Sequence, residues 1–207
     1  MNQGYERIGR VSTDSVFKHT RRHWKDWIPL LDKAGARTWT HQEIVKYLAV
    51  KHKLSLWWQQ GVAYGYEIAV GKRVEGQNVK GKYTVTATKS IPLSISKLWN
   101  FLLSDEGMKI WLKPLSPVRF VPNSMFETDD GFFGEVRTMK KNSRIRITWQ
   151  DPNWEKKTVV QISLIPRPNH KSLLVVDHAD IVSSKIKTQL GLRWRLVVTE
   201  LQKHLSD

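Results

Sequence analysis

The chain has 207 residues, of which 34 are Lys or Arg and 19 are Asp or Glu, so its formal net charge is +15. It contains no cysteine, which excludes disulfides, thiol catalysis and cysteine-based zinc sites. An apolar share of 40% is enough to form a core and argues against wholesale disorder. No run of apolar residues approaches the roughly 18 of a membrane-spanning helix, and the first residues lack the apolar stretch of a secretory signal. We therefore expect a cytoplasmic protein that does not insert into membranes.

Three glycines and four basic residues lie between residues 71 and 82, where the hydrophobic pattern changes from helical to mostly strand-like. Such a composition is typical of a linker, which we place at residues 76–82. The linker separates a predicted all-helical module at residues 1–75 from a second domain at residues 83–207.

The first module is predicted to be a small helical bundle. Apolar residues recur at helical spacing over residues 24–34, 41–53 and 56–70. Thr40 and Glu43 have the spacing of a capping box and mark the start of the second helix.

The second domain begins with an alternating strand pattern at residues 83–91, followed by helical patterns at 91–105 and 106–112. Residues 118–181 have the pattern of several short strands separated by turns. The chain closes with a long amphipathic helix at about residues 184–205. This order predicts an α+β fold, in which a curved antiparallel sheet has its concave face covered by the last helix.

Three segments of the second domain have a familiar pattern: TKSIPLSISKLWNFLLSDEGMKIWL, the strand LLVVDHADI, and the final helix with Trp194 and Leu201. With the opening strand, they resemble the activator-of-Hsp90-ATPase-like branch of the START-related (SRPBCC) superfamily, which has the helix-grip fold. The resemblance implies a cavity between the long helix and the sheet. In such families the cavity commonly holds an apolar or amphipathic small molecule. Some relatives catalyse reactions there, many only bind, and a few are co-chaperones.

The first module resembles a small helical module of unknown function that often precedes this domain. The segments that carry this resemblance are WKDWIPLLD, THQEIVKYL, WWQQGVAYGYE and GKR. The residues of its motif are Trp57, Trp58, Tyr66, Glu67, Gly71 and Arg73. The resemblance implies no activity for this module.

We predict that the ligand is held by aromatic and aliphatic side chains, because such groups line most small-molecule cavities. The candidate wall residues are Trp99, Trp111, Phe120, Phe133, Ile147, Trp149, Ile162, Val176 and Trp194. A strand phase shifted by one residue would exchange each inward side chain for its neighbour. His178 is a candidate polar anchor or acid–base group. We favour the alternative that it hydrogen-bonds a neighbouring strand or helix.

No motif in the chain indicates catalysis or a cofactor. Residues 76–83 match GxxxxGK, but Tyr83 replaces the required Ser or Thr and the segment leads into a strand. His19 and His23 lie four residues apart in a strongly basic segment, which disfavours a metal ion. There is no GxSxG motif. We therefore expect no metal, no cofactor and no catalytic residue, and favour a protein that is not an enzyme.

A second hypothesis is a protein-interaction or chaperone-cofactor role, in which Trp57, Trp58, Tyr64 and Tyr66 form an exposed docking face. A third is non-specific nucleic-acid binding through basic surface. Against direct DNA reading, the predicted helix at 56–70 contains no Lys or Arg, although its position imitates the second helix of a helix-turn-helix.

Overall fold

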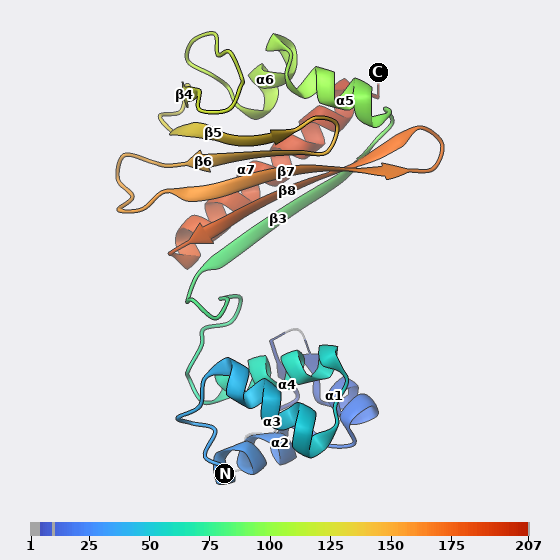
Figure 1. The fold of residues 1–207 in the computed structure, drawn as a ribbon, viewed down its shortest axis with the longest axis vertical. Coiled ribbons are helices and arrows are strands. Elements are labelled where there is room, and N and C mark those ends of the chain that lie inside the picture. Colours follow the sequence, from blue (N-terminus) through green and yellow to red (C-terminus); the bar gives the residue numbers. More distant parts are fainter. Residues whose placement is uncertain (1–4, 10, 207) are drawn as a thin grey trace. The chain divides into compact units, whose positions relative to one another are not determined.

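The computed structural model describes residues 5–9 and 11–206. The chain divides into two compact units, one ending at Gly81 and the other beginning at Lys82 (Figure 1). We call them the helical unit and the helix-grip unit and describe each by itself.

The helical unit consists of four helices and a short two-stranded hairpin. Its elements are β1 (Arg7–Ile8), β2 (Val11–Ser12), α1 (Thr13–Thr20), α2 (Trp24–Lys33), α3 (His41–His52) and α4 (Leu56–Ala69). The predicted capping box is present: the Thr40 side chain accepts from the Glu43 amide, and the Glu43 carboxylate accepts from the Thr40 amide at 2.6 Å. These bonds satisfy donors that the first helical turn leaves free, which explains why α3 begins there.

Trp24 and Trp27 are fully buried in the core of the helical unit. The ring of Trp24 packs directly against Gly65 of α4, where an added Cβ would lie 2.2 Å from Cη2 of the tryptophan. A side chain at position 65 is therefore incompatible with this packing. The close approach of α4 to Trp24 depends on glycine.

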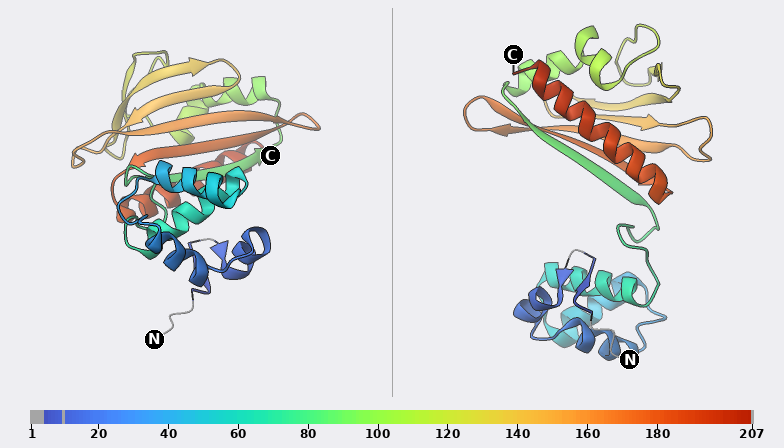
Figure 2. Two further views of the ribbon diagram at one scale, coloured as in Figure 1. Left: turned by 60° about the horizontal axis from the view of Figure 1, so that its bottom comes forward. Right: turned by 180° about the vertical axis from the view of Figure 1, so that it is seen from behind.

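The helix-grip unit combines one sheet with three helices. Its elements are β3 (Tyr83–Ile91), α5 (Ile95–Leu102), α6 (Asp105–Trp111), β4 (Met125–Glu127), β5 (Phe133–Lys140), β6 (Arg144–Trp149), β7 (Thr158–Arg167), β8 (Lys171–Ile181) and α7 (Ser184–His204). The six strands pair antiparallel in the order β3-β8-β7-β6-β5-β4. The long helix α7 crosses one face of the sheet and packs along β3 (Figure 2). This is the predicted α+β, helix-grip fold.

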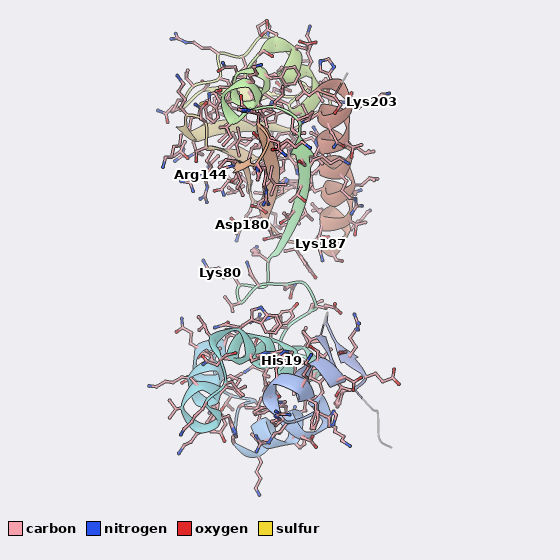
Figure 3. All side chains as sticks on the ribbon, turned by 90° about the vertical axis from the view of Figure 1, so that its right-hand side faces the viewer. His19, Lys80, Arg144, Asp180, Lys187 and Lys203 are labelled. Carbon is pink, nitrogen blue, oxygen red and sulfur yellow. The ribbon has the colours of Figure 1, made fainter. Side chains whose placement is uncertain are left out.

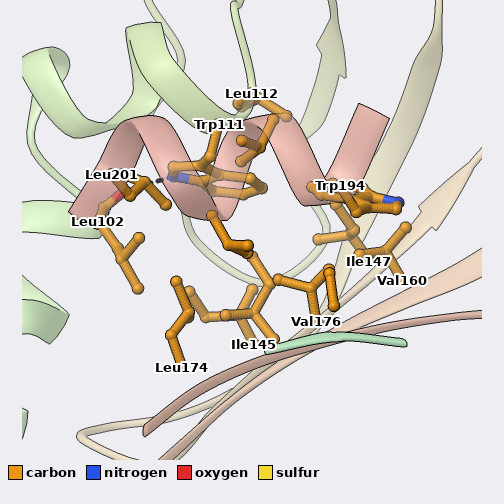
Figure 4. Close-up of a cluster of buried hydrophobic side chains, with 14 of the residues drawn as sticks. Leu102, Trp111, Leu112, Ile145, Ile147, Val160, Leu174, Val176, Trp194 and Leu201 are labelled. Carbon is orange, nitrogen blue, oxygen red and sulfur yellow. Dashed lines mark hydrogen bonds between the residues drawn. The ribbon is translucent and has the colours of Figure 1, made fainter. Parts of the chain in front are cut away.

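Alternation along the strands decides which side chains enter the core between α7 and the sheet. Ile145, Ile147 and Trp149 of β6 are at most 1% exposed, whereas Arg144 and Arg146 are exposed. The buried side chains from strands and helices meet in one continuous cluster (Figure 4). Burial of this cluster is the main force that holds α7 on the sheet.

The strand pattern predicted from residue 118 begins later in the structure. Residues 113–124 are irregular, and the first strand of this region is β4 at Met125. Some of their backbone hydrogen bonds join this segment to strands: the Leu115 amide donates to the carbonyl of Glu127 at 2.9 Å, and the Asn123 amide donates to that of Val136 at 2.7 Å. The apolar residues of this segment therefore form a loop along the edge of the sheet instead of a strand within it.

Candidate functional site

The structure gathers most of the predicted cavity walls in one buried core. These residues are Trp99, Trp111, Phe120, Ile147, Trp149, Ile162, Val176 and Trp194, and each is 0–8% exposed. Phe133, the ninth, lies at the start of β5 and is half-buried.

The centre of this core has no open space beside its largest rings. Trp149 and Trp194 are both 0% exposed, and their ring centroids are 5.7 Å apart. A side chain that borders a space large enough for water keeps some accessible surface. In this conformation the two tryptophans themselves fill the volume beside them, between α7 and the sheet. A ligand cavity lined by the predicted wall residues stays a prediction.

His178 is fully buried, and both of its ring nitrogens are hydrogen-bonded. The indole N–H of Trp194 donates to Nδ1 at 2.9 Å, so in the neutral ring the proton lies on Nε2. Nε2 then donates to Oγ1 of Thr158 at 2.6 Å, and that hydroxyl donates to the carbonyl of Trp149 at 2.7 Å.

Burial, with a smaller contribution from the positive charge of Arg193, lowers the pKa of His178 to about 3. The ring is therefore neutral at physiological pH and ties β8 to β7 and α7. This arrangement corresponds to the alternative reading of His178, a hydrogen bond to neighbouring elements. It leaves neither ring nitrogen for a ligand.

An open groove of about 670 Å³ lies beside β4, and we call it the β4 groove. Its lining residues are Ser116, Pro117, Val118, Arg119, Val121, Ser124, Met125, Phe126, Glu127 and Phe133. Of the predicted wall residues, only Phe133 lines this groove. The others were assigned to a cavity because strand phase reveals which side chains point inward, not whether space remains beside them.

The inner side of the β4 groove is continuous with the aromatic core. Phe126 is 4% exposed, and its ring centroid lies 5.8 Å from that of Trp149. The ring centroid of Phe120 lies 6.5 Å from that of Phe126 and 5.5 Å from that of Trp111. A single layer of phenylalanine therefore separates the groove from the tryptophans of the core.

Sequence reasoning missed most of this groove because it assigned residues from 118 onward to strands. One signal was present in the sequence: apolar residues occur in a segment rich in proline and serine. In the structure three of them remain exposed, Leu115 at 63%, Val121 at 41% and Met125 at 65%. Clustered exposed apolar side chains often mark a binding surface.

Comparison with known proteins shows to which family the chain belongs. The model of activator of Hsp90 ATPase homolog 1-like proteins matches residues 92–206, more than half of the chain. The chain belongs to this family. No match is found among curated proteins.

Solved structures similar to this chain have the same fold. CalU16 from Micromonospora echinospora is 15% identical, with a TM-score of 0.53 over 59% of this chain and 76% of that one. The Aha1 dimer from Colwellia psychrerythraea is 16% identical, with a TM-score of 0.51 over 59% and 95%. Protein MLL2253 from Mesorhizobium loti is 21% identical, with a TM-score of 0.50 over 59% and 96%. At these identities the similarity shows the fold alone.

The helical unit precedes the residues that match the family, and its predicted docking residues do not form one exposed face. Trp57 is 63% exposed, but Trp58 is 8% exposed and Tyr66 is fully buried. The Tyr66 hydroxyl donates to Asp32 at 2.6 Å, and the half-buried Tyr64 hydroxyl accepts from the Gly76 amide at 2.7 Å. The expected patch was therefore wrong, because three of its four rings pack within the unit.

Two further results concern metals and membranes. Within residues 5–9 and 11–206, no three His, Asp or Glu side chains are arranged to hold a metal ion. Over the same residues, no helix has the length and apolar character needed to cross a membrane.

Proposed function

We propose that this family member binds a small apolar or amphipathic molecule in the β4 groove. The observation that carries the proposal is the groove itself, whose volume of about 670 Å³ lies within the range of roughly 300–1,000 Å³ typical of small-molecule sites. Its apolar lining includes Val118, Met125 and Phe126. Burying these side chains against an apolar ligand would release water from them, which is the main source of affinity in such a site.

The polar residues of the groove favour an amphipathic ligand. Arg119 and Glu127 both line it, together with two serines. Ser124 is already engaged, since its hydroxyl lies 2.7 Å from the carbonyl of Arg119 and accepts from the Val121 amide at 3.2 Å. The charged groups of Arg119 and Glu127 and the hydroxyl of Ser116 therefore remain to orient the polar end of a ligand.

The loop that forms one wall is held in place by backbone hydrogen bonds to the sheet edge. The Val136 amide donates to the carbonyl of Ser124 at 2.9 Å, next to the bond from Asn123 to Val136. A preformed wall supports binding because less conformational entropy is lost when the ligand is held.

The predicted wall residues in the core would form a deeper part of the same binding site. Rotation of Phe126 would connect the groove with Trp149, whose indole Nε1 is buried and has no hydrogen-bond partner among the described residues. An unpartnered buried donor costs about 1–3 kcal/mol, which a ligand acceptor would recover. In this proposal a long ligand reaches Trp149, whereas a short one stays in the groove.

Binding of the uncharged apolar fluorescent probe Nile red tests the proposal, with native mass spectrometry of the purified chain to detect a retained ligand. Met125→Lys places a charge at an exposed lining position and should weaken probe binding about tenfold or more, because the apolar contact is lost. Ile165→Lys is the matched control, since Ile165 is an exposed apolar strand residue of the same unit outside the groove. Equal probe binding by both variants would refute the groove assignment. Alanine at Trp149 and Trp194 is a poor test, because both rings are core.

The two other hypotheses have less support. Docking through the helical unit relied on four exposed rings, of which only Trp57 is exposed. Nucleic-acid binding favours basic side chains gathered in one stripe. The basic side chains labelled in Figure 3 come from both units, with Lys80 in the first and Arg144 and Lys203 in the second.

A further inference from the structure

A polar pocket in the helical unit is used by nothing described so far. Its volume is about 730 Å³, and it is formed by the start of α3, by one side of α4 and by residues 72–81. The residues that matter for its chemistry are Trp39, His41, Gln60, Lys72, Arg73 and Gln77. We call it the His41 pocket.

A buried ion cluster forms its inner wall. The Glu67 side chain is 5% exposed and lies 2.5 Å from Nη2 of Arg73, whose own side chain is 9% exposed. Nδ1 of His41 lies 3.1 Å from both carboxylate oxygens of Glu67. Chiefly because of this hydrogen bond, the pKa of His41 is raised above its ordinary value. The carboxylate therefore holds two cationic groups and has both oxygens engaged.

The charges that line the pocket do not balance. Protonated His41, Lys72 and Arg73 are positive, and Glu67 is the sole acidic residue among the lining residues. The surplus is two positive charges when His41 is protonated. His41 is also the first residue of α3, so the positive end of that helix dipole lies at the same place.

The hydrogen-bonding groups are also unbalanced. Oε1 of Gln60 lies 2.9 Å from Nε2 of His41, and Oε1 of Gln77 accepts from the Val74 amide at 3.2 Å. The hydrogen bonds found among the described residues engage these two amide oxygens but neither amide nitrogen. These two amide oxygens are therefore occupied, and the two amide nitrogens remain as donors for a ligand.

A purely structural role explains only part of this arrangement. The ion cluster joins α3, α4 and the segment that follows α4, and this role uses the oxygens of Glu67. The ammonium of Lys72 also has a structural part, since it donates to the carbonyls of Ala36 and Trp39. Neither role requires an open pocket, spare amide donors or a net positive charge beside them. The half-buried indole of Trp39 adds a flat apolar wall to the same pocket.

From this combination we infer that the helical unit holds a second binding site, for a small molecule with a carboxylate or phosphate group and a flat ring. The negative group pairs with the surplus positive charge and takes the spare donors, and the ring lies on Trp39. This site is independent of the β4 groove and is formed by different residues.

Titration of the full-length chain with phenyl phosphate, benzoate and uncharged benzyl alcohol tests the inference, with the indole N–H signal of Trp39 as the NMR readout. Phenyl phosphate or benzoate should bind at least ten times more tightly than benzyl alcohol, and the better of the two identifies the anionic group. The inference is overturned if neither anion shifts the Trp39 signal, or if benzyl alcohol binds equally well.

A matched pair of variants separates a built site from general attraction to a basic protein. Lys72→Gln removes one pocket charge and should weaken binding of the preferred anion at least fivefold. Lys80→Gln removes the same charge from an exposed residue nearby that does not line the pocket, and should change binding less than twofold. Equal weakening by both would mean that the anion is held by net charge alone and would refute the site. Met125→Lys should leave this binding unchanged, so failure of the β4 groove and failure of the His41 pocket are distinguishable.

Discussion

Replacing His178 by glutamine should remove an acid-sensitive contribution to the stability of the helix-grip unit. The buried ring of His178 stays neutral because its pKa is lowered to about 3. In the unfolded chain a histidine has a pKa of about 6.5. The unfolded state therefore binds one more proton than the folded state wherever the pH lies between these two values. The resulting stabilisation is present above pH 6.5 and is lost as the pH falls toward 3.

The magnitude follows from the difference between the two protonation equilibria. At pH 5 the unfolded histidine is protonated and the folded one is not, so the free energy of unfolding falls by about 1.4 kcal/mol for each of 1.5 pH units, or about 2 kcal/mol. At pH 8 the same effect is close to zero. Glutamine has an amide oxygen that can accept from Trp194 and an amide nitrogen that can donate to Thr158, but it does not titrate.

Urea unfolding of both proteins at pH 5, 6, 7 and 8 would measure this effect, with the native indole N–H signal of Trp194 reporting on the helix-grip unit. The free energy of unfolding of the wild type should fall by about 2 kcal/mol more than that of His178→Gln between pH 8 and pH 5. The titration of the other histidines contributes equally to both proteins, so it cancels when the two unfolding free energies are subtracted. His170→Asn is the control, since His170 is exposed and asparagine tolerates its φ of 54°. A difference that does not change with pH would refute the neutral, buried ring.

Two further predictions concern the helical unit. Gly65→Ala should destabilise it by about 3 kcal/mol, because the new Cβ would lie 2.2 Å from the ring of Trp24. Gly61→Ala in the same helix is the control: its Cβ would lie 3.7 Å from the nearest tryptophan ring, so it should stabilise the unit by about 0.5–1 kcal/mol. Equal thermal unfolding temperatures for the two variants would contradict this prediction. Glu67 raises the pKa of His41, so their interaction stabilises the fold fully below pH 6.5 and is lost as the pH rises through the folded pKa. In an NMR titration, Glu67→Gln should return the pKa of His41 toward its ordinary value, and an unchanged titration would show that another group holds the proton.

The order and type of the main elements could be predicted from the sequence because both depend on local pattern. The strand at 83–91 and the start of α3 at His41 are observed where alternation and the capping box place them. The inward faces of β6 and β7 also follow from alternation, since a two-residue period is a property of the backbone alone. The loop at 113–124 was missed because the backbone of Leu115, Asn123 and Ser124 bonds to strands that follow later in the chain, which no local pattern reveals.

The candidate sites depended on contacts that no local pattern contains. Alternation shows that Trp149 points inward, but only the spacing between α7 and the sheet decides whether its ring fills the core or borders a cavity. Likewise His41 meets Glu67 across 26 residues and Arg73 lies beside both, an arrangement created when α3 packs on α4. The sequence by itself determined the elements and their buried faces. Tertiary packing decided where space and unpaired charge remain, because both depend on how separate elements approach one another.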